Sequence, residues 1–252
     1  MGKVIAVANQ KGGVGKTTTC INLCPALKER GSRVLLCDMD PQSNSTSGLG
    51  VEKNKNAPNM YNVLIEGVNA SEAVVHTPYG DVLPSNKILS GAGVELVTTR
   101  GREFILKNVL SDIRGDYDYI LVDCPPSLEM LTLNSLCAAD AVLIPVQCEY
   151  FALEGLTDLM TTIRMIKKSL NPALDIEGVL LTMYDARTNF SSQVAAEIKK
   201  YFKQKVYNVS IPRNVRLSEA PSHGKPVIEY DRLSRGSVAY LELAKEIIRR
   251  NR

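Results

Sequence analysis

The residues best suited to chemistry stand near the start of the chain, in a glycine-rich segment with two lysines and two threonines. The segment reads Gln10-Lys11-Gly12-Gly13-Val14-Gly15-Lys16-Thr17-Thr18. Glycine lets successive backbone N–H groups turn toward a single anion. A lysine such as Lys16 can reach the β- and γ-phosphates of a nucleoside triphosphate, and the Thr17 hydroxyl can ligate Mg²⁺. The segment therefore predicts a phosphate-binding loop.

The setting of this segment supports the prediction. It follows an apolar run, Lys3–Ala8, that is typical of a strand, and it opens a predicted helix over Thr17–Arg30. A helix N-terminus adds a partial positive charge that attracts phosphate. The usual pattern has a glycine where this chain has Gln10, and Lys11 is an additional lysine at the front of the loop. A glycine-rich turn with two solvated lysines is the alternative, and the flanking strand and helix favour phosphate binding.

Three carboxylates are candidates for metal and water chemistry. Asp123 ends the apolar run Tyr119–Val122 and precedes a cysteine and two prolines. Walker-type ATPases need an acid at such a strand end to hold Mg²⁺, although capping a turn is an alternative role. Strand alternation puts Asp38 and Asp40 on one side of the chain. Either of these two could face Mg²⁺ or orient the attacking water.

Apolar runs alternate with helical patterns along the whole chain. The runs are short, rich in valine, isoleucine and leucine, and show little polar alternation, as in a parallel sheet covered on both faces. The predicted strands are Lys3–Ala8, Arg33–Asp38, Tyr119–Asp123, Ala141–Val146 and Ile176–Met183. The predicted helices are Thr17–Arg30 (closed by Gly31), Arg102–Ile113, Phe151–Ser169, Ser191–Phe202 and Ser237–Arg250.

This alternation predicts the α/β fold class. We expect one doubly wound domain over residues 1–252, with a mostly parallel sheet flanked by helices. Ligands of such folds bind at the carboxyl ends of the strands, where the phosphate loop and the three carboxylates are expected. Residues 44–116 show a weaker pattern, with a loop over Asn54–Asn59 and no site that the residues define.

The composition of the 252-residue chain, with 44% hydrophobic and 23% charged residues, is that of a globular protein. No apolar run reaches 18 residues, so no transmembrane helix is expected, and the first strand is too short for a signal peptide. We therefore expect a cytoplasmic protein with six reduced cysteines. Cys20 and Cys24 lie one helical turn apart, but no second pair completes a metal site, which favours core packing. His76 and His223 are expected in loops.

Several motifs resemble those of one family of ATPases. Residues 11–18 resemble the deviant Walker A motif of the ParA/MinD ATPases. Asp38-Met39-Asp40-Pro41-Gln42 resembles their second acidic motif, and Val122-Asp123-Cys124-Pro125-Pro126-Ser127 resembles their Walker B motif. Residues 145–150, 182–187 and 211–221 are similar to the chromosomal partition branch, ParA/Soj. The resemblance spans nearly the whole chain and implies a P-loop NTPase fold.

The resemblance also implies roles for individual residues. Lys11, Lys16 and Asp40 would be catalytic, because Lys11 reaches the partner's nucleotide across a dimer interface, as an arginine finger does, and Asp40 positions the hydrolytic water. Mg²⁺ would be held by Thr17, Asp40 and Asp123. The residues implied to contact ATP are Lys11, Gly12, Gly13, Val14, Gly15, Lys16, Thr17, Thr18, Met183, Pro212 and Asn214, the last three at the adenine.

The family's reaction cycle is implied in the same way. ATP binding allows a sandwich homodimer, and the dimer binds double-stranded DNA without sequence preference. A ParB-like centromere-binding protein then stimulates hydrolysis and releases the dimer, while the intrinsic ATPase rate is slow. The protein would associate with the nucleoid and serve chromosome or plasmid segregation.

The charge distribution is consistent with a DNA partner. The chain carries a net charge of +3, and residues 185–225 contain eight basic and three acidic residues, a net charge of +5. Phosphate contacts need such a basic footprint. The candidates for DNA contact are Arg187, Lys199, Lys203, Arg213 and Arg216. Lys199 and Lys203 are one turn apart on a predicted helix, for which a solvated face is the alternative. No recognition helix is evident, so binding should be independent of sequence.

Three other functions share part of this pattern. A MinD-like membrane switch needs an amphipathic C-terminal helix. An apolar stripe precedes the terminal arginines, and it consists of Leu241, Ala244, Ile247 and Ile248. Core packing of this stripe is the favoured interpretation, so no membrane contact is expected. A metal-cluster carrier related to nitrogenase iron protein needs a second cysteine near Cys124, and a small-molecule kinase needs an acceptor or lid motif, which we do not find.

Overall fold

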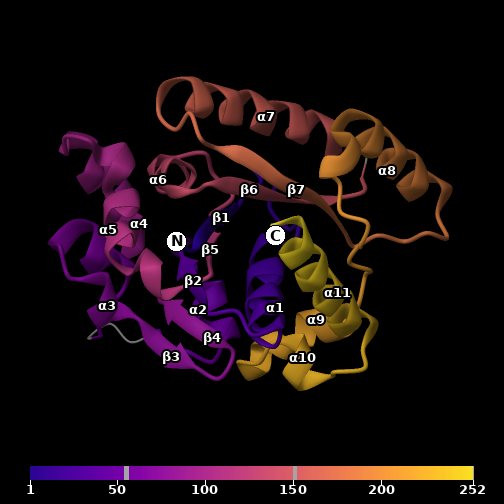
Figure 1. Cartoon of the computed structure of the whole chain (residues 1–252), viewed down its shortest axis with the longest axis horizontal. Helices are drawn as coiled ribbons and strands as arrows, with labels where there is room; N and C mark the ends of the chain where they lie inside the picture. The colour runs from indigo at the N-terminus through magenta and orange to yellow at the C-terminus, as the bar shows by residue number, and fades with distance from the viewer. Residues whose placement is uncertain (54–56, 150–151, 252) are drawn as a thin grey trace.

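A seven-stranded sheet forms the centre of the computed structural model, which describes residues 1–53, 57–149 and 152–251 (Figure 1). The strands lie in the order β3-β4-β2-β5-β1-β6-β7, and every neighbouring pair except β3 and β4 is parallel. Their bounds are β1 Lys3–Val7, β2 Val34–Asp38, β3 Val75–Thr77, β4 Gly80–Leu83, β5 Tyr119–Asp123, β6 Ala141–Gln147 and β7 Asp175–Thr182. The predicted α/β class with a mostly parallel sheet is confirmed.

Both faces of the sheet are buried, as the apolar strand sequences predict. Along β1 the side chains of Val4 and Ala6 belong to one hydrophobic cluster, and those of Ile5 and Val7 belong to a second one on the opposite face. This is the period-two alternation of a strand with apolar neighbours above and below it. Packing on both faces therefore fixes the central strands and the positions of the residues at their carboxyl ends.

Two groups of helices supply these neighbours (Figure 1). The first cluster contains side chains of α5 Ile105–Ile113, α6 Met130–Ala138, α7 Ala152–Ser169 and α8 Asn189–Phe202. The second contains side chains of α1 Lys16–Lys28, α9 Val215–Glu219, α10 Val227–Tyr230 and α11 Arg235–Arg250. The layers are those of a doubly wound fold, and the loop between β1 and α1 emerges at the centre of the sheet.

The long elements agree with the sequence predictions to within three residues at their ends. β7 stops at Thr182, one residue early, because Met183 adopts a left-handed φ of 48° that a strand does not allow. Helix α11 starts at Arg235, two residues early, because the hydroxyl of Ser234 caps it by accepting the Ser237 N–H. Gly31 closes the first helix with a φ of 84°, as predicted. Phe151, the predicted start of α7, lies outside the described residues.

The segment 44–116 holds short elements that the sequence did not reveal. They are α2 Asn44–Gly48, a π-helical turn Asn62–Glu66, α3 Ala70–Ala73, β3, β4, α4 Leu89–Glu95 and three 3-10 turns, Leu96–Thr98, Arg102–Phe104 and Arg114–Asp116. None exceeds seven residues, so none contains enough repeats to show a period. His76, expected in a loop, lies on the edge strand β3. Residues 54–56 of the predicted loop Asn54–Asn59 lie outside the described residues.

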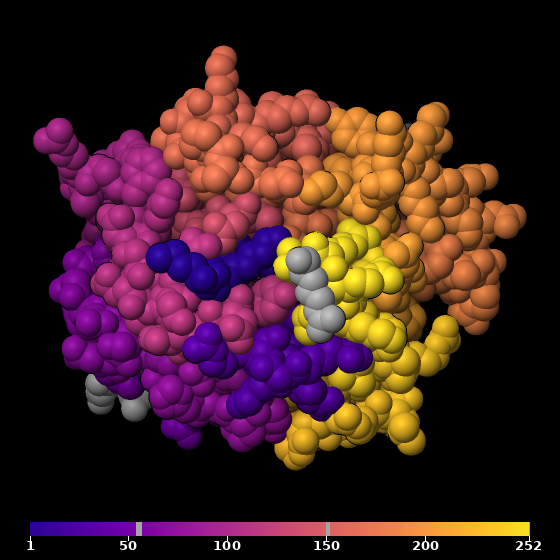
Figure 2. Space-filling view, viewed as in Figure 1, coloured from indigo at the N-terminus to yellow at the C-terminus, as the bar shows by residue number. Residues whose placement is uncertain are grey.

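The two ends of the chain meet at the amino-terminal edge of the sheet. Figure 2 shows the first residues beside the end of α11 on one face of the molecule. The ammonium of Lys3 lies 2.5 Å from the Glu177 carboxylate and bonds to Asn251 as well. The phosphate loop follows the carboxyl end of β1. The terminal contacts and the loop therefore lie at opposite ends of the strands.

Candidate active site

The loop between β1 and α1 has the backbone that phosphate binding needs. Gly13 has a φ of 74° and Gly15 a φ of 91°, conformations that are strained for residues with a Cβ. Gly15 is the N-cap of α1, so the loop leads directly into the helix N-terminus. Gly12 and Gly13 are exposed, and no atom lies within 4 Å of where their Cβ atoms would be. The loop is therefore open on its outer side.

Lys16 lies inside this loop rather than on the surface. It is 6% exposed, and its Nζ donates a hydrogen bond to the Lys11 carbonyl oxygen at 3.1 Å. Burial lowers the pKa of Lys16, while the nearby carboxylates of Asp123 and Asp40 act in the opposite direction. An ammonium held against the glycine-rich loop at a helix N-terminus is placed to meet phosphate oxygens.

Two residues that the sequence analysis did not single out hold the loop in place. The Asn9 side chain donates to the Pro145 carbonyl at 2.8 Å and accepts the Lys11 N–H at 3.0 Å. The Thr182 hydroxyl donates to the Val14 carbonyl at 2.8 Å. Asn9 follows β1 directly, and a polar residue between a buried strand and a glycine loop was the available signal. Thr182 lies 168 positions from Val14, and nothing in the sequence indicated this contact with the loop.

Asp38 and Asp123 end neighbouring strands and pair in register across β2 and β5. Both are fully buried. Neither carboxylate oxygen of Asp123 has a hydrogen-bond partner among the described residues. Burial first, and the Asp38 carboxylate second, raise the pKa of Asp123 to about 8, although the nearby hydroxyls of Thr17 and Ser45 act against this rise.

The buried carboxylate of Asp123 fits a Mg²⁺ ligand. Unpartnered buried carboxylate oxygens are costly unless a cation or donor meets them. Among the described residues no three carboxylate, imidazole or thiol groups converge to hold a metal by themselves. Mg²⁺ commonly takes only one or two protein oxygens and completes its shell with substrate phosphates and water. Asp123 and the neighbouring Thr17 hydroxyl could supply those oxygens.

The structure distinguishes Asp38 from Asp40. Strand alternation left their roles open, and the family resemblance assigned them to Asp40. One Asp38 oxygen accepts both the N–H and the hydroxyl of Thr46, at 2.8 and 2.6 Å, and the other accepts the Asp40 N–H at 3.1 Å. Asp38 is thus committed to holding the loop that follows β2. Asp40 is only half-buried, and its Oδ1 accepts the Gln42 N–H at 2.9 Å. Asp40 is the carboxylate of the two that stays available at the site.

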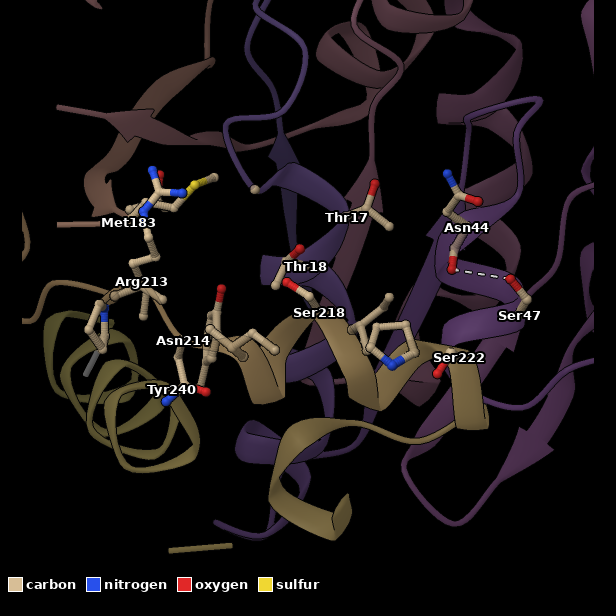
Figure 3. Close-up of a pocket in the computed structure, with 17 residues that line it drawn as sticks. Thr17, Thr18, Asn44, Ser47, Met183, Arg213, Asn214, Ser218, Ser222 and Tyr240 are labelled. Carbon is tan, nitrogen blue, oxygen red and sulfur yellow. Dashed lines mark hydrogen bonds between the residues drawn. The ribbon is translucent and has the colours of Figure 1, made fainter. Parts of the chain in front are cut away.

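A cavity of about 510 Å³ adjoins the loop (Figure 3). Thr17 and Thr18 form one wall, and Met183, Pro212 and Asn214 form another, so the three residues predicted at the adenine line the same cavity as the loop. Figure 3 shows Met183, Arg213 and Asn214 on one side of Thr18, with Asn44 and Ser47 on the other. The volume and the mixed polar and apolar lining suit a nucleotide base and sugar.

Comparison with known proteins matches this site to one family. The profile of the family described as "AAA domain" matches residues 2–176. The sporulation initiation inhibitor protein Soj of Bacillus subtilis is 57% identical over 98% of this chain and 98% of its own length. The chromosome partitioning protein ParA of Caulobacter vibrioides is 54% identical over 99% of this chain and 95% of its own. The chain belongs to the ParA/Soj family of chromosome-partition ATPases.

Solved structures agree with the ParA/Soj assignment. Cobyrinic acid a,c-diamide synthase from Mycobacterium smegmatis, with bound ATP analog and magnesium, has a TM-score of 0.89 and 40% identity, over 99% of this chain and 95% of that one. The septum site-determining protein MinD of Pyrococcus horikoshii, complexed with Mg-ADP, has a TM-score of 0.80 and 27% identity, over 98% and 96% of the two chains. Nucleotide and magnesium therefore occur in related structures of this ParA/Soj fold.

Lys11, the additional lysine of the ParA/Soj loop, forms an ion pair within its own chain. Its Nζ lies 2.8 Å from Glu149 Oε2, and both side chains are partly exposed, 37% and 46% respectively. Glu149 also contacts the Gln147 amide. Lys11 is therefore held by its own chain at the edge of the site. It is not among the residues that line the nucleotide cavity.

The residues predicted to contact DNA are only partly brought together. Arg187 and Arg213 line a second hollow of about 790 Å³, with Arg235 of α11 as a third arginine. Arg216, on α9, is paired with Glu219 at 2.8 Å and with Asp231 at 3.2 Å. Lys199 is exposed on α8. Sequence reasoning missed Arg235 because it counted charge only to residue 225.

The prediction that Lys199 and Lys203 share a helix face is wrong. Helix α8 ends at Phe202, and Lys203 has a φ of 49° that turns the chain out of the helix. Phe202 is buried, and Lys205 bonds to Asp175 and to the Ile176 carbonyl, which pulls the chain toward the start of β7. Lys203 therefore lines a hollow at the amino-terminal ends of the strands, whereas the nucleotide cavity lies at their carboxyl ends.

The C-terminal stripe belongs to the core, as favoured from the sequence. Ala244 and Ile247 are fully buried, and Leu241 and Ile248 pack against the same cluster. Helix α11 lies against α1, the helix that carries the phosphate loop. All six cysteines are free and buried, with Cys20 and Cys24 in the core. Among the described residues, no helix is both long and apolar enough to cross a membrane.

Proposed function

We propose that this chain is an ATP-driven partition switch. It binds ATP with Mg²⁺, forms a homodimer, and binds double-stranded DNA without sequence preference. Slow hydrolysis, stimulated by a ParB-like centromere-binding partner, releases the dimer from the nucleoid. The observation that carries the proposal is a buried loop lysine, Lys16, in the field of the buried Asp123 carboxylate, whose oxygens have no hydrogen-bond partner among the described residues. The names of the relatives at 57% and 54% identity favour partition over the synthase named for the neighbour at 40%.

Each group in the site then has a chemical task. Amides of the loop and the Lys16 ammonium hold the phosphates and stabilise the charge that develops on them during transfer. Thr17 and Asp123 hold Mg²⁺, which neutralises phosphate charge when bound. Asp40 accepts a hydrogen bond from water and orients it toward the γ-phosphate, aided by the fixed loop that Asp38 anchors. Met183 and Pro212 enclose the adenine.

Dimerisation would follow from the γ-phosphate. Lys11 would leave Glu149 and contact the phosphates bound by the partner, since a fixed phosphate charge attracts it more strongly than a half-exposed carboxylate does. Dimerisation doubles the number of arginines that face DNA, and two modest sites joined in one body bind by avidity. The nucleotide cavity and the arginine hollow also share Pro212 and Arg213 in their walls, which supports coupling between nucleotide and DNA.

The membrane-switch alternative lacks its anchoring element within the described chain. Helix α11, the candidate for a lipid-binding segment, uses its apolar face to cover α1. Releasing it would expose that core. We therefore place the protein in the cytoplasm, associated with the nucleoid.

The test of the switch uses Asp40→Ala, which should bind ATP and fail to hydrolyse it. With ATP and Mg²⁺ the variant should be a dimer that shifts DNA, and with ADP a monomer that does not. Size and DNA binding are measured in each nucleotide, with Asp112→Ala, an exposed carboxylate on α5, as the matched control that hydrolyses normally. Identical size and DNA binding in both nucleotides would remove the switch.

The DNA surface is tested separately. Arg187→Glu combined with Arg216→Glu should abolish DNA binding and leave ATP binding intact, because neither residue is in the phosphate loop. Arg33→Glu, an exposed arginine paired with Asp118 elsewhere on the surface, is the control. A double variant that still shifts DNA with the wild-type salt dependence contradicts the assignment.

A further inference from the structure

The arginine hollow gathers basic side chains from three separate parts of the chain. Arg187 follows β7, Arg213 precedes α9, and Arg235 is the first residue of α11. All three are exposed, and 90% of the Arg187 side chain is accessible. Guanidinium groups that converge on an open hollow form a site for a planar or tetrahedral oxyanion.

The pairing within the hollow is uneven. Asp185 holds Arg187 through two side-chain contacts of 2.7 and 2.9 Å, and it accepts the Arg187 N–H at 3.0 Å. Among the described residues, the side chains of Arg213 and Arg235 have no hydrogen-bond or ion-pair partner. Arg187 holds the pKa of Asp185 well below its usual range, and Arg235 adds to this. Asp185 is thus a counter-ion already seated among the arginines.

We propose that Arg235 is a further contact to the DNA backbone, and that Asp185 occupies the position of a phosphate until DNA arrives. This inference rests on the proposed DNA binding and extends it to two residues. Glu242 also lines the hollow, but its carboxylate lies 3.6 Å from the Lys245 ammonium, so Asp185 is the carboxylate of the lining that is paired with an arginine. A phosphodiester that displaces Asp185 from Arg187 gains three guanidinium neighbours in one hollow.

The shape of the hollow favours a backbone phosphate over a small free anion. At about 790 Å³ it is far larger than one phosphate ion, and Leu233 and Val238 form exposed apolar parts of its wall. A phosphate ion has no means to cover those side chains, whereas the sugars of a polynucleotide can lie against them. Backbone contacts of this kind position DNA and carry no sequence information.

The experiment measures DNA affinity against salt concentration with ATP and Mg²⁺ in the Asp40→Ala background. If Arg235 neutralises one phosphate, Arg235→Ala should lower affinity about eightfold at 0.1 M salt and reduce the salt slope by about 0.9. Arg249→Ala is the control, because Arg249 is exposed on the same helix about 21 Å away at the opposite end. An unchanged slope in Arg235→Ala, with a wild-type-like dimer, overturns the role of Arg235.

A second variant tests whether Asp185 competes with DNA for Arg187 or orients Arg187 for DNA binding. Asp185→Asn keeps an oxygen for the Arg187 N–H but removes the charge, so DNA affinity should rise about threefold. A fall in affinity would show that Asp185 orients Arg187 for DNA instead, and it would refute the counter-ion role. Inorganic phosphate at matched ionic strength should compete no better than chloride, and strong competition would assign the hollow to free phosphate. If the Asp40→Ala background protein binds no DNA with ATP, the proposed function itself fails.

Discussion

The nucleotide cavity and the arginine hollow share Pro212 and Arg213 in their walls, but they hold their charges in different ways. Lys16, the first residue of α1, and Asp123, the last residue of the central strand β5, are both buried. Arg187 and Arg235 are exposed, and solvent and counter-ions surround them. Ligand binding in the nucleotide cavity should therefore depend on the positions of buried groups, and binding in the arginine hollow should depend on net charge, which salt screens.

This contrast leads to different expectations for mutations. In the nucleotide cavity, replacing a neutral hydrogen-bonding side chain should change function, since a buried donor or acceptor left unpaired is costly. In the arginine hollow, only a change of charge should matter greatly. Substitutions at the buried metal ligand should therefore have the strongest consequences, and charge-conserving changes in the hollow the weakest.

Asp123→Asn should reduce ATP hydrolysis by about 100-fold or more, because the variant loses the charge that would hold Mg²⁺ at the phosphates. Turnover under single-cycle conditions measures this. Asp118→Asn, a half-exposed carboxylate near the start of the same strand, serves as the control. Turnover within about threefold of the wild type would show that another group holds the metal.

The same substitution should change how stability depends on pH. The folded pKa of Asp123, about 8, lies above its usual value of 3.8, so the folded protein binds more protons than the unfolded chain between these values. Stability from this group therefore falls as pH rises through that window. Without nucleotide, Asp123→Asn should lose less stability than the wild type between about pH 5 and pH 8, by about 1.4 kcal/mol for each pKa unit involved. Denaturant titrations at each pH measure the free energy of unfolding. The same change with pH in Asp123→Asn and in the wild type would contradict the prediction.

Asn9→Ala should weaken ATP binding roughly tenfold, since the loop loses its bond to Pro145 and the Lys11 N–H loses its acceptor. Titration calorimetry provides the measurement. Asn9→Asp keeps the acceptor but places a buried carboxylate against the Pro145 carbonyl oxygen and beside the phosphate loop, so it should bind ATP no better than Asn9→Ala. Wild-type affinity in both variants would show that the glycines alone shape the loop.

Thr182→Val should have a smaller effect, about fivefold on ATP affinity, because one neutral hydrogen bond to the Val14 carbonyl is removed with little change in volume. Thr182→Ser keeps the hydroxyl and should bind ATP as the wild type does. If Ser and Val variants bind equally well, the hydroxyl does not position the loop.

Arg213→Lys should have the smallest effect, below about twofold on DNA affinity, because an exposed point charge serves a backbone phosphate nearly as well as a guanidinium. Arg213→Ala is the comparison and should shift the salt slope. A loss in Arg213→Lys as large as that in Arg213→Ala would show that the hollow needs guanidinium geometry, and would bring it closer in kind to the buried site.

Much of the nucleotide site could be predicted because its chemistry is contiguous in sequence. The loop residues, Lys16 and Thr17 follow one strand, and the acids end two others, so strand patterns and spacing were enough. The residues alone could not show which of Asp38 and Asp40 stays available, since that depends on bonds from Thr46 that only the folded loop provides, and only the family resemblance indicated Asp40. The support from Thr182 depends on a contact between residues 168 positions apart.

The arginine hollow was harder to predict because its members come from segments that sheet topology brings together. Charge counting identified Arg187 and Arg213 but stopped before Arg235. It also grouped Lys203 with Lys199, although the left-handed turn at Lys203 sends it to the other edge of the sheet. The long helices and central strands were predictable from their period, whereas the short elements between residues 44 and 116 were not.

The central claim is that the loop after β1 binds a triphosphate through Lys16. Titration calorimetry of ATP with Mg²⁺ into the wild type and into Lys16→Ala tests it most directly. We predict uptake of one ATP per chain by the wild type and no detectable uptake by a folded Lys16→Ala variant. Absence of heat in the wild type, or equal uptake by the variant, would contradict the claim.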